Sequence, residues 1–139
     1  MSSPRETVLT FHDHFNAGRT DEVLAMATDD IAVGGARGRG EGPDLLGEWV
    51  RRKTTTLTPQ RWFAREDLVV VEELVEWRTR RDETVTDRAV WGMAFTVRDG
   101  KIARIARYAD IGEAVTSSGL DESHEMDAET DVSRSDASS

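Results

Sequence analysis

The sequence predicts an α+β domain in which three N-terminal helices pack in a strongly curved, mixed or antiparallel sheet. Two observations predict this class. Apolar residues recur at helical spacing within residues 7–53 of the 139-residue chain, and long segments of alternating side chains follow, separated by short polar turns. Helices followed by strands are typical of α+β proteins, and a chain of this length builds one core.

Three helices are expected before the strands. They cover residues 7–17, residues 20–27 with Thr20 as the N-terminal cap, and residues 44–53. A brief strand at 29–33 and the segment "GGARGRGEGP", which its glycines predict to be a loop, separate the last two. The inward faces of these helices are expected to carry Val8, Phe11, Phe15, Val23, Leu24, Leu46, Trp49 and Val50.

Four strands are expected from residue 57 onward. The segments 57–65, 68–80, 83–98 and 101–111 are rich in β-branched and aromatic residues, and the turns between them predict antiparallel hairpins. The third segment alternates most clearly, since Trp91, Met93 and Phe95 share one face. That face is predicted to line the core, and a short helix at 111–118 is expected to follow.

Charge is unevenly distributed along the chain. The net charge is −9, but seven acidic residues and one arginine occur from Asp121 onward, which leaves −3 for the preceding residues. Few large apolar residues follow Leu120, so we expect a domain at 1–118 and a disordered acidic tail at 119–139. Elsewhere acids and arginines are interleaved, which argues against a nucleic-acid partner.

The chain has no cysteine, so disulfides and thiolate metal sites are excluded. No basic N-terminal segment leads into an apolar run, and no 18 apolar residues are consecutive, so a soluble cytoplasmic protein without a membrane partner is expected. The segment "FHDHF" offers His12, Asp13 and His14, but successive helical residues point about 100° apart and cannot converge on one ion. Neither a metal nor a cofactor is expected.

Three segments carry a resemblance to a known family. "FNAGRTDEVLAMATDDIAV", "GRGEGPDLLGEWV" and "FTVRDGKIARIARYADI" occur in an order and at a spacing that resemble the nuclear transport factor 2-like superfamily, most closely its SnoaL-like branch. The resemblance covers about residues 5–116. It implies a cone-shaped α+β barrel, a mostly apolar pocket for a small apolar or aromatic molecule, and a homodimer formed through the sheets.

The sequence departs from two catalytic patterns of this superfamily. Aligned with ketosteroid isomerases, Phe11 occupies the position of the oxyanion-holding tyrosine and Gly35 that of the proton-abstracting aspartate, so that mechanism lacks both groups. Arg78 resembles the arginine of limonene epoxide hydrolases, but Arg80 stands where their aspartate would be. Arg78 therefore remains a candidate only for ligand binding.

The end of the last strand resembles the SnoaL-type cyclases, in which a pocket aspartate acts as acid or base. This resemblance assigns the role to Asp110, with the only tyrosine, Tyr108, or a rim residue, His12, assisting. A shift of one residue would turn Arg107 inward instead. The alternative for Asp110 is a structural cap of the following helix.

Two functions remain open from the sequence. One is a cofactor-independent cyclase, isomerase or lyase acting on a small apolar carbonyl compound, with Asp110 as acid or base. The other is a non-catalytic module that binds a ligand or only dimerises. In either case the expected pocket residues are Phe11, Trp49, Trp91 and Phe95, and Trp62 and Trp77 are expected on the sheet surface or at a dimer contact.

Overall fold

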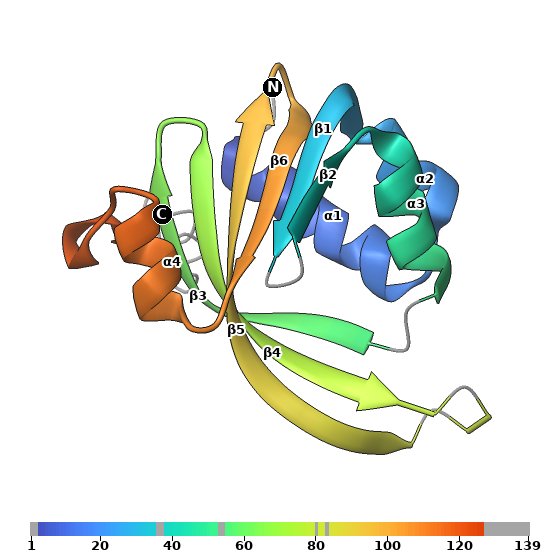
Figure 1. Ribbon diagram of the computed structural model, residues 1–139. Coiled ribbons are helices and arrows are strands. Elements are labelled where there is room, and N and C mark those ends of the chain that lie inside the picture. Colours follow the sequence, from blue (N-terminus) through green and yellow to red (C-terminus); the bar gives the residue numbers. More distant parts are fainter. Residues whose placement is uncertain (1–2, 36–37, 53–54, 80, 83, 127–139) are drawn as a thin grey trace, which may run out of the picture.

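The computed structural model describes residues 3–35, 38–52, 55–79, 81–82 and 84–126 (Figure 1). Among the described residues, three α-helices precede a run of four consecutive strands, and a fourth α-helix follows it. In order, the elements are α1 (Pro4–Asn16), α2 (Thr20–Ala25), β1 (Ala27–Gly35), β2 (Gly38–Glu41), α3 (Pro43–Arg52), β3 (Thr55–Arg65), β4 (Leu68–Arg78), β5 (Val85–Arg98), β6 (Lys101–Tyr108), α4 (Ile111–Ser117), the 3-10 helix η1 (Glu122–His124) and β7 (Glu125–Met126).

Helix α1 begins three residues earlier than predicted because Ser3 and Glu6 form a capping box. The Ser3 hydroxyl accepts a hydrogen bond from the Glu6 amide, and the Glu6 carboxylate accepts one from the Ser3 amide. The predicted cap of α2 was wrong, since Thr20 is its first helical residue and Arg19 precedes it without a side-chain cap. Among the helices of the described residues, none has the length and apolar character needed to cross a membrane.

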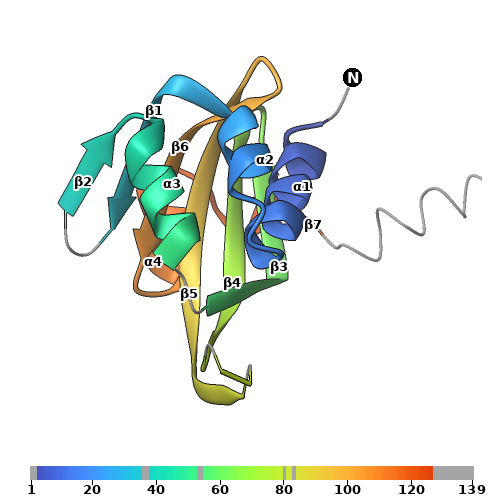
Figure 2. The same ribbon diagram turned by 90° about the vertical axis from the view of Figure 1, so that its right-hand side faces the viewer.

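The sheet is mixed and open. Its strand order is β2-β1-β6-β5-β4-β3-β7, in which β1 and β6 are parallel and the other neighbours are antiparallel. The sheet curls around the three N-terminal helices, with the long β4–β5 hairpin extending beyond them (Figures 1 and 2). This confirms the predicted α+β class and the curved sheet, although the two edge strands do not pair to close a barrel.

The glycine-rich segment contains a strand that the sequence did not predict. Strand β2 pairs with β1 from Ala32 opposite Glu41 to Gly35 opposite Gly38. The loop prediction was wrong at these positions because backbone hydrogen bonds hold the pair, and they need no β-forming side chain. Residues 36–37 of the predicted loop lie outside the described residues.

Helix α4 covers the outer face of the sheet, while α1, α2 and α3 lie against the inner face (Figure 1). The outer core includes three buried alanines, Ala94, Ala106 and Ala114, and Gly92 of β5 allows the closest approach of α4. A Cβ on Gly92 would lie 2.4 Å from the Asp110 carbonyl oxygen and 2.7 Å from the Ala114 Cβ. Glycine is therefore required here by the contact between α4 and β5.

Residues 119–126 belong to the folded part, which corrects the boundary expected at residue 118. Leu120 is buried against the outer core, β7 pairs with β3, and the Arg61 guanidinium donates two hydrogen bonds to Glu125. A few well-placed contacts hold this segment despite its polar composition. The disordered tail stays a prediction for residues 127–139, which lie outside the described residues.

Candidate functional site

A histidine and a glutamate form a hydrogen-bonded pair in the middle of the inner core. His12 lies on the face of α1 that contacts the sheet, and Glu73 lies on the inner face of β4 between Val71 and Val75. The His12 Nε2 and Glu73 Oε2 atoms are 2.5 Å apart, and the two residues are 2% and 0% exposed. His12 is therefore in the core and not at the pocket rim where the sequence placed it.

The hydrogen bonds of His12 indicate how many protons the His12–Glu73 pair carries. The Nδ1 atom is 2.7 Å from the Val8 carbonyl oxygen, which can only accept, so Nδ1 carries a hydrogen and donates it. One further proton then lies between Nε2 and Oε2. The pair is an imidazolium with a carboxylate or an imidazole with a carboxylic acid, and both forms have no net charge.

Two opposing effects act on the pKa of His12. Burial lowers it, because the imidazolium loses its hydration. The negative charge of Glu73, together with hydrogen bonds to Glu73 and to the Val8 carbonyl and the charge of Asp13, more than reverses this effect. The pKa of His12 consequently lies above its usual value of 6.5.

The second carboxyl oxygen of Glu73 has no hydrogen-bond partner among the described residues, although it is fully buried. A buried polar atom left unpaired costs about 1–3 kcal/mol. In both forms of the pair the shared proton is carried by either Nε2 or Oε2. Oε1 carries no proton and can therefore accept a hydrogen bond in either form. It is the one group of this pair that is chemically available to a donor from a bound molecule.

Aromatic rings surround the pair and keep its environment apolar. The rings of Phe11, Phe95 and Trp62 lie 5.8, 5.7 and 6.1 Å from the His12 ring, measured between centroids. The Arg5 guanidinium lies 4.8 Å from the Trp62 ring. In such surroundings hydrogen bonds and charges interact more strongly than in water.

A second aromatic group lies beside Glu73 on the neighbouring strands. Trp91 of β5 is directly opposite Glu73, and Trp77 of β4 contacts Trp91 edge to face at 5.6 Å. Arg107 of β6 places its guanidinium 4.3 Å from the Trp91 ring. All three side chains are partly buried, so they form the more accessible side of the interior.

The structure does not bring Asp110 and Tyr108 to this site. A register shift in the β5–β6 pair makes Ala103 an extra residue, since Thr96 pairs with Arg104 while Val97 pairs with Ile102. Beyond it Arg107 pairs with Met93 on the inner face, and Tyr108 joins the outer core. The register that placed Tyr108 and Asp110 inward was wrong, and the alternative with Arg107 inward is the observed one.

Asp110 has the structural role that was its alternative. Its exposed carboxylate accepts a hydrogen bond of 2.8 Å from the Glu113 amide and caps α4. Arg78 is also away from the interior, because its guanidinium contacts Thr56 and Glu76 on the outer side of the sheet. His14, which the metal hypothesis considered, accepts from the Arg19 side chain.

Some of the positions predicted for the aromatic residues agree with the structure and others do not. Phe11 and Phe95 lie in the inner core as expected, and the partly buried Trp49 contacts Phe15 at 4.6 Å. Trp62 and Trp77 were expected on the sheet surface or at a dimer contact, but Trp62 is buried in the inner core and the partly buried Trp77 packs against it. A bulge in β3 between Pro59 and Arg61 shifts its alternation and turns Trp62 inward.

Glu73 was missed by the sequence analysis. The signal was an acidic residue flanked by valines at alternate positions of a strand, Val71 and Val75, which places a carboxyl among core side chains. The adjacent Glu72 obscured it, because either glutamate could have been the outward one.

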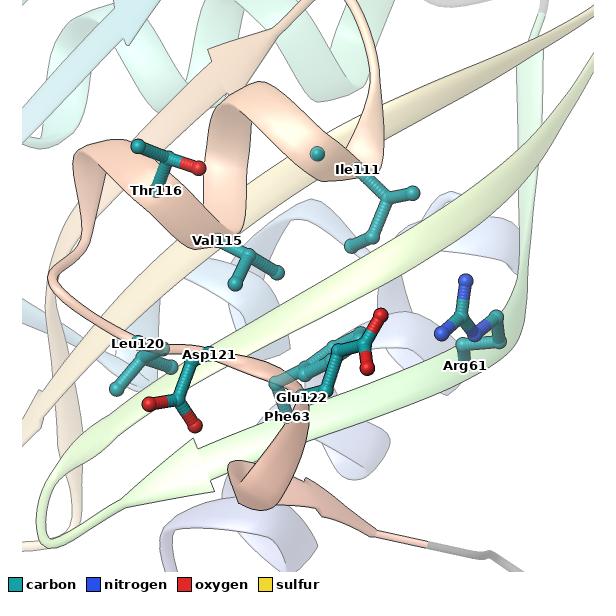
Figure 3. Close-up of a pocket in the computed structure, with 9 residues that line it drawn as sticks. Arg61, Phe63, Ile111, Val115, Thr116, Leu120, Asp121 and Glu122 are labelled. Carbon is teal, nitrogen blue, oxygen red and sulfur yellow. The ribbon is translucent and has the colours of Figure 1, made fainter.

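A separate hollow of about 340 Å³ lies on the outer side, between α4, β3 and η1 (Figure 3). Phe63, Val115 and Leu120 form its apolar part, and Arg61, Asp121 and Glu122 its charged part. Arg61 is already paired with Glu125. This hollow is across the sheet from the His12–Glu73 pair and has no buried unpaired group, so the inner site is the stronger candidate.

Comparison with known proteins places the chain in a family. The SnoaL-like domain family matches residues 8–105, whereas no curated protein matches the chain. Many solved structures are similar to it, and three of them bear on its function. A protein from Sinorhizobium meliloti, provisionally named a polyketide cyclase, has a TM-score of 0.63 at 20% identity and covers 73% of this chain and 93% of its own.

Two further similar structures were determined with other molecules present. TerC, co-crystallised with polyporic acid, has a TM-score of 0.66 at 21% identity, covering 81% of this chain and 95% of its own. A protein of ketosteroid isomerase-like fold from Catenulispora acidiphila, in complex with trimethylamine, has a TM-score of 0.65 at 16% identity, covering 86% and 96%. These likenesses show the fold, and the family match extends over most of the chain. The chain belongs to the SnoaL-like domain family.

Proposed function

We propose that the chain binds a small, largely apolar carbonyl compound inside the cone and that Glu73, held by His12, exchanges a proton with it. The observation that carries this proposal is the buried and unpartnered Oε1 of Glu73. Polar atoms left unpaired in a core are destabilising, and at functional sites such a group is available to a ligand.

The proposed reaction is proton transfer next to a carbonyl group. Glu73 Oε1 takes the proton from the carbon beside the carbonyl, and the electron pair of the broken C–H bond moves into the carbonyl to form an enolate. The same carboxyl then returns the proton at another carbon or oxygen. Alternatively, the enolate carbon attacks a second carbonyl and closes a ring, and the alkoxide that forms takes the proton back from the Glu73 carboxyl. No electrons are gained or lost overall, and His12 holds the carboxyl in place throughout.

The family context supports a small-molecule ligand. Structures of the same fold were determined with polyporic acid and with trimethylamine, and another carries the name of a cyclase. The aromatic surroundings of Trp77, Trp91 and Trp49 would suit a flat or cyclic molecule.

Binding without turnover is the second candidate. Phe11 and Phe95 contact each other in the inner core next to His12, with their ring centroids 5.5 Å apart. This contact favours an interior in which side chains fill the space around His12, so that a substrate does not reach Glu73. Both ring nitrogens of His12 are also occupied by protein partners. On this alternative the ligand would occupy only the side near Trp91.

Exchange of the α-protons of 2-tetralone in D2O, followed by ¹H NMR, separates the candidates. Proton transfer predicts faster exchange with the wild-type protein and loss of that acceleration in Glu73→Gln. Glu72→Gln is the matched control, because Glu72 is the adjacent carboxylate on the other face of β4. Binding of 2-tetralone without accelerated exchange would support the second candidate, and no binding at all would contradict both.

We further propose that the chain forms a homodimer through the outer sheet face that α4 leaves open. Leu74 and Val90 are paired across β4 and β5 there, and Val90 is 49% exposed. Light scattering should give twice the chain mass for the wild type and the monomer mass for Val90→Glu, whereas a monomeric wild type would contradict this. A cytoplasmic location stays a prediction.

A further inference from the structure

We propose that the ligand of the inner site is an anion, whose negative group binds Arg107 while a hydroxyl at its other end donates to Glu73 Oε1. This inference rests on the proposed function, since it uses the same inner face of the sheet and the same carboxyl oxygen. It adds the charge of the ligand and its orientation.

Arg107 is on the inner face because it pairs directly with Met93, a core residue of β5. Its guanidinium lies over the Trp91 ring at 4.3 Å and is partly buried. Stacking of this kind covers a flat face of the guanidinium and leaves its N–H groups, which lie in the plane, free to donate.

No acidic side chain of the described residues is paired with Arg107. Three arginines on the outer face have such partners: Arg61 contacts Glu125, and Arg78 and Arg88 both contact Glu76. A cation that faces a partly buried, aromatic interior without a counter-charge would bind an anionic ligand group well, most strongly in the two-pronged geometry of a carboxylate.

The two polar groups are suitably spaced for one molecule. Glu73, Trp91 and Arg107 lie on three adjacent strands, β4, β5 and β6, with Trp91 directly opposite Glu73. Neighbouring strands are separated by about 4.8 Å, so β4 and β6 are about 10 Å apart. Glu73 supplies an acceptor at one end, Arg107 supplies donors at the other, and Trp91 lies between them, a pattern that selects a flat anion with a hydroxyl opposite its charge.

Isothermal titration calorimetry with three naphthalene probes tests the proposal. The probes are 6-hydroxy-2-naphthoate, 6-methoxy-2-naphthoate, which lacks the donated hydrogen, and 2-naphthol, which lacks the charge. Wild-type protein should bind 6-hydroxy-2-naphthoate at least tenfold more tightly than either of the others. Comparable affinity for all three probes would overturn the proposal.

Variants of Arg107 test whether this residue binds the carboxylate end of the probe. Arg107→Met should weaken binding of 6-hydroxy-2-naphthoate at least tenfold and remove its preference over 2-naphthol, whereas Arg107→Lys should retain part of the preference. Arg104→Met is the control, because Arg104 is exposed on the same strand. A carboxylate preference that persists in Arg107→Met would overturn the assignment.

The experiment also distinguishes failure of the anion proposal from failure of the proposed function. If 2-naphthol binds and Glu73→Gln weakens it, but the carboxylate brings no gain, the anion proposal fails and the proposed function stands. If no probe binds, or if Glu73→Gln changes the affinity of none of them, the proposed function fails together with the inference that rests on it.

Discussion

The inner and outer faces of the sheet are closed in opposite ways. Where α4 packs, the outer face has the small residues Gly92, Ala94 and Ala106, so that the helix can approach closely, and the Asp110 carboxylate caps its N-terminus by accepting from the Glu113 amide. The inner face uses large aromatic rings and encloses a His–Glu pair with an acceptor left over. One face is built for close contact, and the other retains a polar group that contact alone does not require.

The largest expected effect comes from breaking the inner pair on one side. His12→Leu should lower the free energy of unfolding by about 3–5 kcal/mol, because Glu73 is left buried without its partner. The double variant with Glu73→Leu should regain much of this loss, since no polar group then remains unpaired. Urea unfolding measures both. A double variant as unstable as the single one would show that packing of the imidazole, and not pairing, is what matters.

The outer face should be sensitive to size instead of charge. Gly92→Ala is expected to lower the free energy of unfolding by about 2–3 kcal/mol, because the new Cβ would overlap the Asp110 carbonyl and Ala114. Gly112→Ala is a suitable control, because its Cβ would come no closer than 3.3 Å to the Asp110 side chain. Equal stability of the two variants would contradict the proposed close contact.

The pH dependence of stability should report the inner pair. Since the pKa of His12 is raised on folding, the folded protein binds more protons than the unfolded one above pH 6.5. This contribution is complete below pH 6.5 and is lost as the pH rises through the folded pKa, by up to about 1.4 kcal/mol per pH unit. Urea unfolding from pH 5 to 9 measures it, and the double leucine variant should lack this component.

The smallest effect is expected at the cap of α4. Asp110→Ala should lower the free energy of unfolding by about 1 kcal/mol, while Asp110→Asn should change it little because asparagine also caps well. Neither variant should alter 2-tetralone exchange. Loss of exchange in Asp110→Asn would return this residue to the catalytic role that the sequence suggested.

Periodicity and turn residues were enough to predict most of the fold. The Asp99–Gly100 turn, with both residues at positive φ, and the alternation around Trp91 are read directly from the sequence. The β1–β2 pair and the inward direction of Trp62 were not predictable in this way. They depend on backbone pairing and on bulges, which leave no pattern in the side chains.

The site was predicted only in part for a related reason. His12 was identified as a candidate by its residue type, but its partner is 61 positions away and is found only when α1 crosses β4. Strand β4 has valine at three successive positions, 69–71, because both of its faces are buried. Alternation therefore could not decide whether Glu72 or Glu73 points inward.

The extra residue at Ala103 has an evolutionary consequence. The bulge decides which of two neighbouring side chains, Arg107 or Tyr108, faces the interior. Regular pairing through Ala103 would turn Tyr108 inward in place of Arg107, which would exchange a cationic interior for a phenolic one without any change of sequence in the strand. Relatives that pair this hairpin without the bulge should thus differ in ligand charge more than their percentage identity suggests.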